Sequence, residues 1–553
     1  MSDQNTNAVL DTAHVGDIRG AFGTISHGDT GPRTGLPARL KTLLAILGPG
    51  LIVMVGDNDA GAFSTYAQAG QNYGTSLLWT LALLIPVLYV NQEMVLRLGA
   101  VTGVGHARLI LERFGKFWGA FSVIDLFVLN ALTIITEFIG ISLGLDFLGV
   151  PKIAGVAVAA VLIVVAAGTG DFRRFERFAM TLVVGSLLLI PLFLMIHPPL
   201  ARVAHDLAVP QLPAHAALSE VMLLIIGIVG TTVAPWQLFF QQSYVIDKRI
   251  TPRFIRYERL DLWLGIVLVM FGAIAVMACI AQVFEGAPEA GNFVDSGTVA
   301  AGIAKYYGRV PGILFAIALI DASIIGAAAI SLSSAYAIGD VFSVKHSLHR
   351  KPSDAKGFYA VYCVLIVAAA ALVLIPGMPL GLLTNTVQTL AGVLLPSAVV
   401  FLLLLCNDEQ VLGPWVNNRL TNLVTIVIVG ILLILSVLLT ASILFPALVA
   451  AHLTPTRLLN VMIICAVLAL LIGFGNLVMS RIRKISQPVA TQLPVRLQKP
   501  TRSELDHWRM PPLEQLRPLK VTLSTRIWMG VLRGYLVAAA LLVICKVILI
   551  AFQ

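Results

Sequence analysis

Two acidic residues and an amide interrupt an apolar stretch near the N-terminus of this 553-residue chain. The interruption reads Gly56-Asp57-Asn58-Asp59-Ala60-Gly61 and lies between Leu51 and Tyr66. An ionised aspartate at the centre of a membrane costs about 2.5–3.5 kcal/mol on insertion scales. The flanking glycines weaken a helix, so we expect the backbone to unwind here. Two carboxylates in such a place predict a cation as the ligand.

A second apolar stretch is interrupted in a similar way. It reads Gly227-Ile-Val-Gly230-Thr231-Thr232-Val233-Ala234-Pro235-Trp236-Gln237. Gly and Pro in mid-membrane disturb helical hydrogen bonding and leave backbone groups that need partners. Two broken helices in corresponding positions of two halves predict an inverted-repeat transporter with its site at the midplane. A pair of kinks used only for helix packing is the alternative interpretation, and the acidic residues of the first break argue against it.

The composition places these breaks in a polytopic helical membrane protein. Hydrophobic residues make up 58% and charged residues 12% of the chain, about half of the charged share of a soluble domain. The net charge of +9 resides in short loops and one tail, which is typical of membrane orientation rather than of nucleic-acid binding. The five cysteines are scattered in or beside apolar segments and predict neither disulfides nor a thiolate metal site.

Hydrophobic runs of about 18 residues or more recur along the chain and predict membrane-spanning helices. The thirteen predicted spans are 42–66, 76–97, 118–146, 152–168, 178–197, 219–245, 260–284, 312–341, 358–376, 380–405, 421–445, 457–479 and 528–551. The fourth of these is the shortest. The two breaks therefore fall in the first and the sixth span.

Basic residues gather in every second loop. With a cytoplasmic N-terminus, the inward loops hold Arg97, Arg108, Arg113, Lys116, Arg173, Arg174, Arg177, Lys248, Arg249, Arg253, Arg256, Arg259, Lys345, Arg350, Lys351 and Lys356. The outward loops hold only a few, such as Lys152, Arg202, Lys305 and Arg309. This bias predicts that the N-terminus is cytoplasmic. We expect a multi-pass protein of the cell membrane, which in a bacterium is the inner membrane.

Both ends of the chain carry polar segments. Residues 1–41 lack an apolar core, which predicts a disordered cytoplasmic arm and no cleavable signal peptide. Residues 480–527 are basic and rich in proline. They are interpreted either as a solvated cytoplasmic linker or as a regulatory or lipid-contacting strip.

The motifs around the first break carry a specific resemblance. Gly48-Pro49-Gly50, the Asp59-Ala60-Gly61-Ala62 turn, Gln68-Ala69-Gly70 and Tyr73-Gly74 resemble the first helix of the natural resistance-associated macrophage protein (NRAMP) family. The sixth-span motif is similar in frame to that family's sixth helix, and the similarity extends over about residues 42–445. The resemblance implies an all-α fold of five plus five inverted repeats with broken helices 1 and 6, and transport of divalent metal ions.

The resemblance also divides the chain into regions. They are the arm 1–41, a first repeat 42–197, a second repeat 219–405, spans 11 and 12 within 421–479, the basic segment 480–527 and a final span within 528–553. The arm and everything after 445 lie outside the region of similarity.

Two departures from the family pattern remove soft or amide ligands from the implied site. The family's metal-binding Asp corresponds to Asp59, but its Asn corresponds to Ala62 and its sixth-helix Met to Ala234. A thioether favours transition metals over Mg²⁺, so its loss leaves oxygen ligands only. Asp57 either contacts the ion, directly or through water, or hydrogen-bonds within the broken helix. The other predicted ligands are the amides of Asn58, Gln388 and Gln237 and backbone carbonyls near Gly56, Thr231 and Ala234.

Two further departures concern protons. The family's sixth-helix His, associated with proton movement, corresponds to Trp236, and a third-helix Asp corresponds to Ile134. The Glu three residues later remains as Glu137, a predicted residue of the translocation pathway. These changes resemble the NRAMP-related magnesium transporter branch and imply no proton coupling. A wider site lined by small residues suits a partly hydrated Mg²⁺, so Mg²⁺ is the implied substrate, with Mn²⁺ also accepted.

Other functions stay open from the sequence. One is a proton-coupled Mn²⁺ or Fe²⁺ importer of the ordinary family type, and another is a cation-coupled symporter of a small organic solute. An enzyme is not expected, because the sequence has no nucleophile–base pair and no zinc-ligand motif. We expect no cofactor; the predicted partners are the divalent ion as substrate and the lipid bilayer, without nucleic acid. The oligomeric state stays open.

Overall fold

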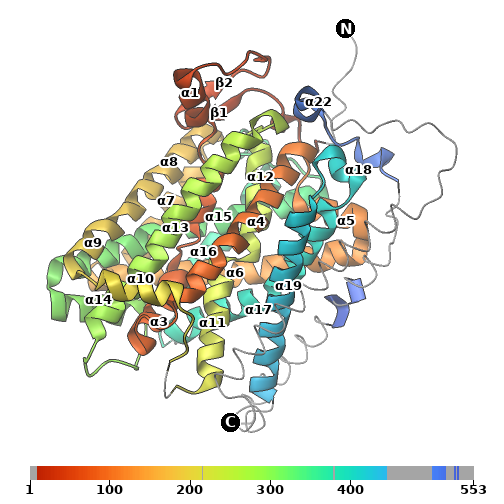
Figure 1. Ribbon diagram of the computed structural model, residues 1–553. Coiled ribbons are helices and arrows are strands. Elements are labelled where there is room, and N and C mark those ends of the chain that lie inside the picture. Colours follow the sequence, from red (N-terminus) through yellow and green to blue (C-terminus); the bar gives the residue numbers. More distant parts are fainter. Residues whose placement is uncertain are drawn as a thin grey trace, which may run out of the picture.

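The computed structural model describes residues 9–213, 216–377, 380–444 and 501–517, together with 529–530 and 532–534. Over this part of the chain the fold is a bundle of helices with one two-stranded hairpin on one face (Figure 1). The predicted all-α membrane fold is confirmed. We call the face that carries the hairpin the N-terminal face.

The helices of the bundle follow one another in chain order. They are α1 (Leu36–Ile46), α2 (Pro49–Gly56), α3 (Ala60–Tyr73), α4 (Leu78–Thr102), α5 (His106–Phe114), α6 (Lys116–Phe147), α7 (Lys152–Ala167), α8 (Phe172–Gly185), α9 (Leu189–Ile196), α10 (Leu200–Ala208), α11 (Leu218–Thr232), α12 (Pro235–Asp247), α13 (Ile255–Phe284), α14 (Ser296–Tyr307), α15 (Arg309–Phe342), α16 (Lys356–Val373), α17 (Leu380–Cys406), α18 (Glu409–Leu412) and α19 (Arg419–Leu444). Short 3-10 turns, η2 (Ser186–Leu188), η3 (Pro252–Phe254) and η4 (Gly413–Trp415), continue or join them.

Eight helical segments of the described residues are long and apolar enough to cross a membrane, and the bent pair of α1 and α2 makes a ninth. The shorter apolar helices α7 and α19 occupy the fourth and the eleventh predicted span. A helix therefore lies at each of the first eleven predicted spans. The twelfth, 457–479, and nearly all of the thirteenth, 528–551, lie outside the described residues.

Large apolar side chains are exposed on the outer helices. Ile153 and Val158 of α7 are 72% and 68% exposed, and Val364 of α16 is 63% exposed. Contiguous apolar surface of this kind is rare on soluble monomers, whereas a lipid bilayer requires it. The chain is a multi-pass integral membrane protein.

The first predicted span, 42–66, is three helices rather than one interrupted helix. α1 and α2 meet at a bend of 49°, and residues 57–59 separate α2 from α3. The bend falls at Gly48, whose φ of 151° lies in a region that favours glycine. Pro49 follows as the first residue of α2, where a missing N–H does no harm.

Two oppositely charged side chains stabilise this bend. The Lys248 ammonium donates hydrogen bonds to the backbone carbonyls of Ile46 (2.6 Å) and Leu47 (2.7 Å) at the end of α1. The Asp261 carboxylate accepts a hydrogen bond from the backbone N–H of Gly50 (2.6 Å) at the start of α2. A cation at a helix C-terminus and an anion at a helix N-terminus both interact favourably with the helix dipole. The bend is therefore held by α12 and α13, which are far away in sequence.

Helices of residues 42–197 pack mainly on helices of residues 219–405. α6 packs along α15, α4 packs on α12, and α13 packs on both α2 and α3. Small residues allow the closest of these contacts. At Gly144 of α6, for example, a β-carbon would lie 2.6 Å from the side chain of Ile320 in α15.

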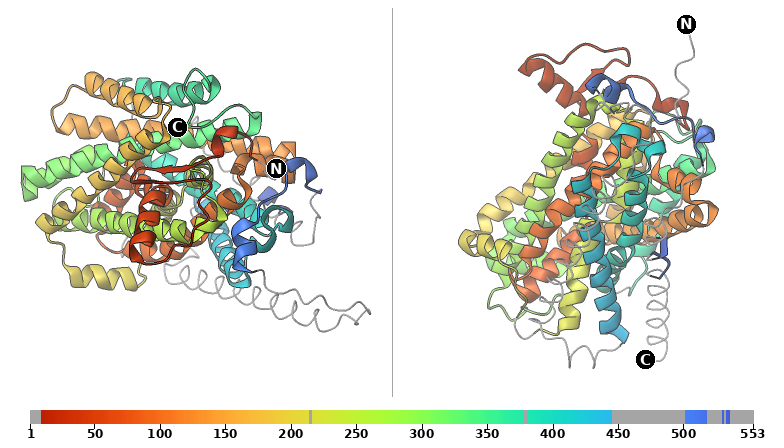
Figure 2. Two further views of the ribbon diagram at one scale, coloured as in Figure 1. Left: turned by 90° about the horizontal axis from the view of Figure 1, so that it is seen from above. Right: turned by 45° about the vertical axis from the view of Figure 1, so that its right-hand side comes forward.

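The predicted disorder of the N-terminal arm is wrong for residues 9–35. The arm forms the turn η1 (Thr12–His14) and the antiparallel hairpin of β1 (Ile18–Gly20) and β2 (Gly23–Ile25), which lies across the bundle when seen from above (Figure 2). Arg350 binds the Asp11 carboxylate at 2.6 Å, and Arg249 donates to the carbonyl of Ala13 at 2.7 Å. Because these partners lie more than 230 residues away, local composition did not reveal them.

Part of the basic segment 480–527 is also folded against the bundle. Residues 501–517 contain α22 (Arg502–His507) and η5 (Leu513–Gln515). The indole N–H of Trp415 donates to the carbonyl of Leu505 at 3.1 Å, and Arg113 donates to the carbonyl of Arg517 at 2.7 Å. The interpretation as a solvated linker is therefore wrong for 501–517, and residues 480–500 lie outside the described part.

Candidate functional site

The break in the first span is an unwound segment between two helix ends. α2 ends at Gly56, and α3 begins at Ala60 with Asp59 as its N-cap. The Asp59 carboxylate accepts a hydrogen bond from the backbone N–H of Ala62 at 2.8 Å, which is the usual way in which an Asp side chain starts a helix. The predicted break is confirmed. The C-terminal end of α2 and the N-terminal end of α3 both lie next to residues 57–59.

The break in the sixth span is narrower. α11 ends at Thr232, Val233 follows outside the helical conformation, Ala234 has extended backbone angles, and α12 begins at Pro235. Proline at the first helical position lacks only an N–H that has no helical partner there. The carbonyl of Thr232 is left free of the helix ladder and lies 3.4 Å from the side-chain N–H of Gln237.

Three consecutive side chains of the first break point to three different helices. Asp57 accepts a hydrogen bond from the Gln237 amide of α12. The Asn58 amide donates to the carbonyl of Val269 in α13 at 3.0 Å. Asp59 lies beside Glu137 of α6, whose carboxylate binds the backbone N–H of the next residue, Ala60. The structure thus brings Asp57, Asp59 and Glu137 together with α12 and α6, while the amide of Asn58 turns to α13.

Glu137 is tied to the start of α3. One of its oxygens accepts a hydrogen bond from the backbone N–H of Ala60 at 3.1 Å, and its other oxygen has no hydrogen-bond partner among the described residues. A β-carbon on Gly326 of α15 would lie 2.8 Å from this carboxylate and 3.0 Å from the β-carbon of Asp59. Glu137, which the family resemblance predicts to be a pathway residue of the third helix, therefore faces the first break.

Gln388 of α17 lies against the first turn of α3. A β-carbon on Gly61 would overlap the Gln388 amide, so only glycine permits this approach. The backbone of α17 also lies close to Gly230 of α11, which is the residue before Thr231. α17 thus joins the two breaks, and the predicted residues Gln388 and Thr231 lie on that junction.

Several buried polar atoms of this region lack hydrogen-bond partners among the described residues. They are Oδ2 of Asp57, Oδ1 of Asn58, Oε1 of Glu137, Oγ1 of Thr231, Nε1 of Trp236 and Nε2 of Gln388. A buried polar group without a partner costs about 1–3 kcal/mol, so such a cluster requires an explanation. The oxygens of Asp57, Asn58, Glu137 and Thr231 among these atoms are ligands for a hard cation, whereas the N–H groups of Trp236 and Gln388 can only donate hydrogen bonds.

A relay of amides fixes Asp57, and sequence reasoning missed its first member. Gln92 of α4 donates to the side-chain oxygen of Gln237 at 2.7 Å. The Gln237 amide nitrogen then donates to Asp57. Gln92 is not among the predicted site residues, although a glutamine in an apolar helix was an available signal. One oxygen of Asp57 therefore hydrogen-bonds within the protein, which is one of the two roles that the sequence left open. The other oxygen has no partner among the described residues and can bind a ligand.

The site is closed in this conformation. Asp57, Asp59, Glu137, Gln237 and Gln388 are at most 2% exposed. A small cavity of about 10 Å³ borders Ala60 and extends toward Ser296 and Thr384, and this volume holds roughly one water.

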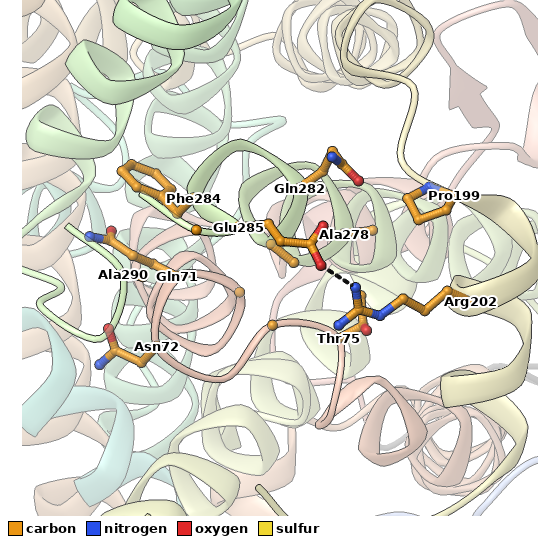
Figure 3. A pocket seen from close by; sticks show the side chains of 14 residues that line it. Gln71, Asn72, Thr75, Pro199, Arg202, Ala278, Gln282, Phe284, Glu285 and Ala290 are labelled. Atoms are coloured by element: carbon orange, nitrogen blue, oxygen red, sulfur yellow. Dashed lines mark hydrogen bonds and ion pairs between the residues drawn. The ribbon is translucent and has the colours of Figure 1, made fainter. Parts of the chain in front are cut away.

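A larger pocket of about 160 Å³ lies away from the site, where α3 and α13 end and α10 begins (Figure 3). An ion pair of 2.7 Å between Arg202 and Glu285 spans it. Gln71 and Asn72 also line it, and none of the predicted site residues does.

Comparison with known proteins places the chain in a family. Residues 50–442 match the family model described as natural resistance-associated macrophage protein-like. This chain belongs to the NRAMP family. The match confirms the family that the motifs indicated, and the magnesium branch within it stays a prediction.

Individual NRAMP relatives agree with this assignment. The divalent metal cation transporter MntH of Ralstonia nicotianae is 31% identical over 403 residues, which cover 69% of this chain and 88% of that protein. MntH of Xylella fastidiosa is 28% identical over 456 residues, covering 79% and 91%. A solved structure of a manganese transporter from Eremococcus coleocola superposes with a TM-score of 0.61 at 19% identity, covering 85% of this chain and 99% of that one. The last comparison shows a shared fold.

The positions at which this NRAMP chain departs from the expected family pattern lie around the two breaks. Ala62 and Ala234 are buried and offer no side-chain ligand. The Trp236 ring lies beside Gly56, 3.6 Å from the place of a β-carbon there. Within the described residues, no group of three or more His, Cys, Asp or Glu side chains is arranged to hold a metal ion. A cation held here therefore depends on two carboxylates supplemented by amide, hydroxyl, carbonyl and water oxygens.

Proposed function

We propose that this protein transports divalent metal ions across a membrane by alternating access. The observation that carries the proposal is the pair Asp57 and Asp59, which lies buried in a broken helix that faces a second broken helix. Membership in the NRAMP family and relatives named as divalent metal cation transporters support it. Relatives with these names also support a transporter rather than an enzyme.

Within this function, we propose Mg²⁺ as the preferred substrate, with Mn²⁺ also accepted. Asp59 supplies the main carboxylate, and the free oxygen of Asp57, the Gln388 amide and backbone carbonyls at Gly56 and Ala234 supply further oxygens. Ala234 stands where the family resemblance implies a thioether, and the unpartnered oxygens at the breaks belong to carboxylate, amide and hydroxyl groups, which favours a hard ion. Mg²⁺ keeps several waters and needs only one or two carboxylates.

We further propose that transport is not coupled to protons. Trp236 and Ile134 replace the titratable residues that the family resemblance led us to expect, and neither side chain can carry a proton. The ordinary alternative, a proton-coupled Mn²⁺ or Fe²⁺ importer, draws support from one observation: the titratable side chain of Glu137 lies beside Asp59. A symporter of an organic solute is disfavoured, because large buried side chains lie against both breaks: Trp236 lies beside Gly56, and Tyr66 hydrogen-bonds Thr232.

The proposed orientation has the N-terminal face in the cytoplasm, with the protein in the inner membrane of a bacterium. The basic loops that end at this face support it. Arg249 and Arg350 belong to such loops, and both bind the folded arm. The proposed repeats, 42–197 and 219–405, then place α3 and α11 in the outer half of the membrane.

The experiment that tests the proposal is metal flux into liposomes that contain the purified protein. Asp59→Asn is the informative variant, because Asn also caps helices and keeps the bond to Ala62 while it removes the charge. Asp125→Asn is a matched control, since Asp125 is an intramembrane acid of α6 outside the site. We expect Mg²⁺ and Mn²⁺ flux in the wild type and the control, and loss of both in Asp59→Asn.

Three results separate the alternatives. Wild-type flux in Asp59→Asn would refute the site. Mn²⁺ flux with neither transport of Mg²⁺ nor competition by it would refute the preference for Mg²⁺. Metal-driven acidification of the liposome interior, followed with a pH-sensitive dye, would show proton coupling and favour the ordinary family type.

A further inference from the structure

A cavity of about 600 Å³ opens on the N-terminal face where three separate parts of the chain meet. Its walls come from the arm, from the ends of α4 and α12, and from residues 507–511 of the tail. The arm and the tail both lie outside the matched region 50–442, and both lie over this face (Figures 1 and 2). Ligand pockets commonly have volumes of about 300–1,000 Å³.

The lining of this cavity is basic. It includes Arg249, Arg509, His14, His27 and His507, and none of its lining residues is an Asp or a Glu. His27 and His507 are exposed, so water and solutes reach them. The excess of cationic groups makes the cavity selective for anions.

The two arginines lack carboxylate partners. Neither Arg249 nor Arg509 takes part in an ion pair among the described residues. Arg249 binds only backbone carbonyls, those of Ala13 and Asp17. Arg509 donates through one nitrogen to the carbonyls of Asp506 and Trp508. Its other guanidinium N–H groups have no hydrogen-bond partner within the described chain and remain available.

Arg509 is partly buried, which reduces the contact of its charge with water. Removal from water lowers the pKa of Arg509 to about 10, although the charge of Asp506 acts in the opposite direction. Other arginines of the same face are paired: Arg113 binds Asp408 at 2.5 Å and Arg350 binds Asp11 at 2.6 Å. Arg249 and Arg509 have no such carboxylate partner, and an anionic ligand would supply one.

We propose that this cavity binds a phosphate-bearing anion. Guanidinium groups pair with phosphate through two parallel hydrogen bonds, and imidazoles add further donors. The Trp508 ring, which lines the same cavity, offers a flat apolar wall beside the charged groups. The phosphate group comes either from a soluble ligand or from a lipid headgroup at the membrane surface. The bound anion links the arm, the tail and the ends of α4 and α12, and this role is independent of the proposed ion transport.

Binding is measured on the full-length protein in nanodiscs, in metal-free buffer with a chelator, so that failure of the transport proposal does not affect the result. Isothermal titration calorimetry in zwitterionic phosphatidylcholine tests pyrophosphate and ATP as soluble probes. Native mass spectrometry of protein from nanodiscs that contain phosphatidic acid tests a lipid headgroup. We expect one equivalent bound by at least one of these probes, with affinity that falls as salt is added.

Arg509→Gln should weaken this binding about tenfold or more, because it removes a charge-assisted contact. The matched control is Arg174→Gln, since Arg174 is an arginine of the same face that is 71% exposed and remote from the cavity. His27→Gln combined with His507→Gln changes two exposed groups and serves as a second variant if Arg509→Gln does not fold. Melting curves establish that each variant is folded.

Each outcome has a definite meaning. Loss of pyrophosphate or ATP binding in the cavity variants, but not in the control, supports a soluble ligand. Retention of phosphatidic acid by the wild type alone, without binding of the soluble probes, supports a lipid headgroup. Absence of binding for all three probes at millimolar concentration, or equal binding in the wild type and the cavity variants, overturns the proposal.

Discussion

Replacement of Lys248 by Met should destabilise the protein strongly. The Lys248 and Glu176 side chains are both fully buried and lie 2.7 Å apart. The same ammonium group donates to the carbonyls of Ile46 and Leu47 at the end of α1. Met fills a similar volume but provides no charge and no donor.

The size of the effect follows from what Met would leave behind. Removing one partner of a buried ion pair costs about 3–5 kcal/mol, because the other charge stays buried without compensation. Glu176 would keep only the hydrogen bond that it accepts from the backbone N–H of Ala21. The two carbonyls of α1 would add to the loss. We therefore expect the melting temperature to fall by on the order of 5 °C or more.

The assay is thermal unfolding of the purified protein in detergent, followed by tryptophan fluorescence. Glu176→Gln added to Lys248→Met removes the uncompensated charge and should restore most of the lost stability. The control is Lys305→Met, which breaks an ion pair with Glu289 at the same distance of 2.7 Å in an exposed position. Exposed pairs contribute little, so this variant should melt like the wild type. An unchanged melting temperature in Lys248→Met, or no recovery in the double variant, would refute the reasoning.

Three further predictions concern the site and the N-terminal face. Gly61→Ala should lower metal flux by about tenfold or more, because its methyl group would displace the Gln388 amide. Ala234→Met should shift the preference in competition assays from Mg²⁺ toward softer Mn²⁺ and Cd²⁺, because it adds a thioether at the second break. Burial alone would lower the pKa of His346, but its hydrogen bond and ion pair with Asp340 raise it to about 9. The stability from this pair is therefore present below about pH 6.5 and lost as pH rises through about 9, so the lower melting temperature of His346→Gln should approach that of the wild type at high pH.

Each of these predictions has its own control. Gly28→Ala changes a glycine of the arm that has open space around it, so flux should stay normal. If Ala234→Met leaves the order of metal preference unchanged, Ala234 does not face the ion. A His346→Gln variant that melts below the wild type by the same amount at low and high pH would show that the charge of His346 contributes nothing.

The breaks in the first and sixth spans could be predicted because they depend on local sequence. Glycine, proline and acidic residues in an apolar run have few interpretations in a membrane. The bend between α1 and α2 was not predicted, although Gly48 and Pro49 mark it. Its angle depends on Lys248 and Asp261, which are about 200 residues away. The folded arm was missed for the same reason, since its polar residues find their partners on distant loops.

It was easier to predict which residues lie near the breaks than to predict the directions of their side chains. In a helix, the period of 3.6 residues tells which side chains share a face. Residues 57–59 are unwound, so their directions had to come from neighbouring helices, and Asn58 turns away from its acidic neighbours as a result. The amide relay from Gln92 likewise depends on how α4 packs against α12.

Asp57 and Asp59 are fixed to different helices, and this difference has a consequence for release of the ion. Asp57 is the C-cap of α2, whereas Asp59 is the N-cap of α3, whose first residue donates a hydrogen bond to Glu137 of α6. We propose that the N-terminal face opens when α1 and α2 leave Lys248 and Asp261. Such a motion would carry Asp57 with it and leave Asp59 in place, because Asp59 is bonded to α3 and α3 is bonded to α6. Separation of the carboxylates weakens the attraction on a divalent ion, so the opening movement itself lowers the affinity on the side where the ion leaves.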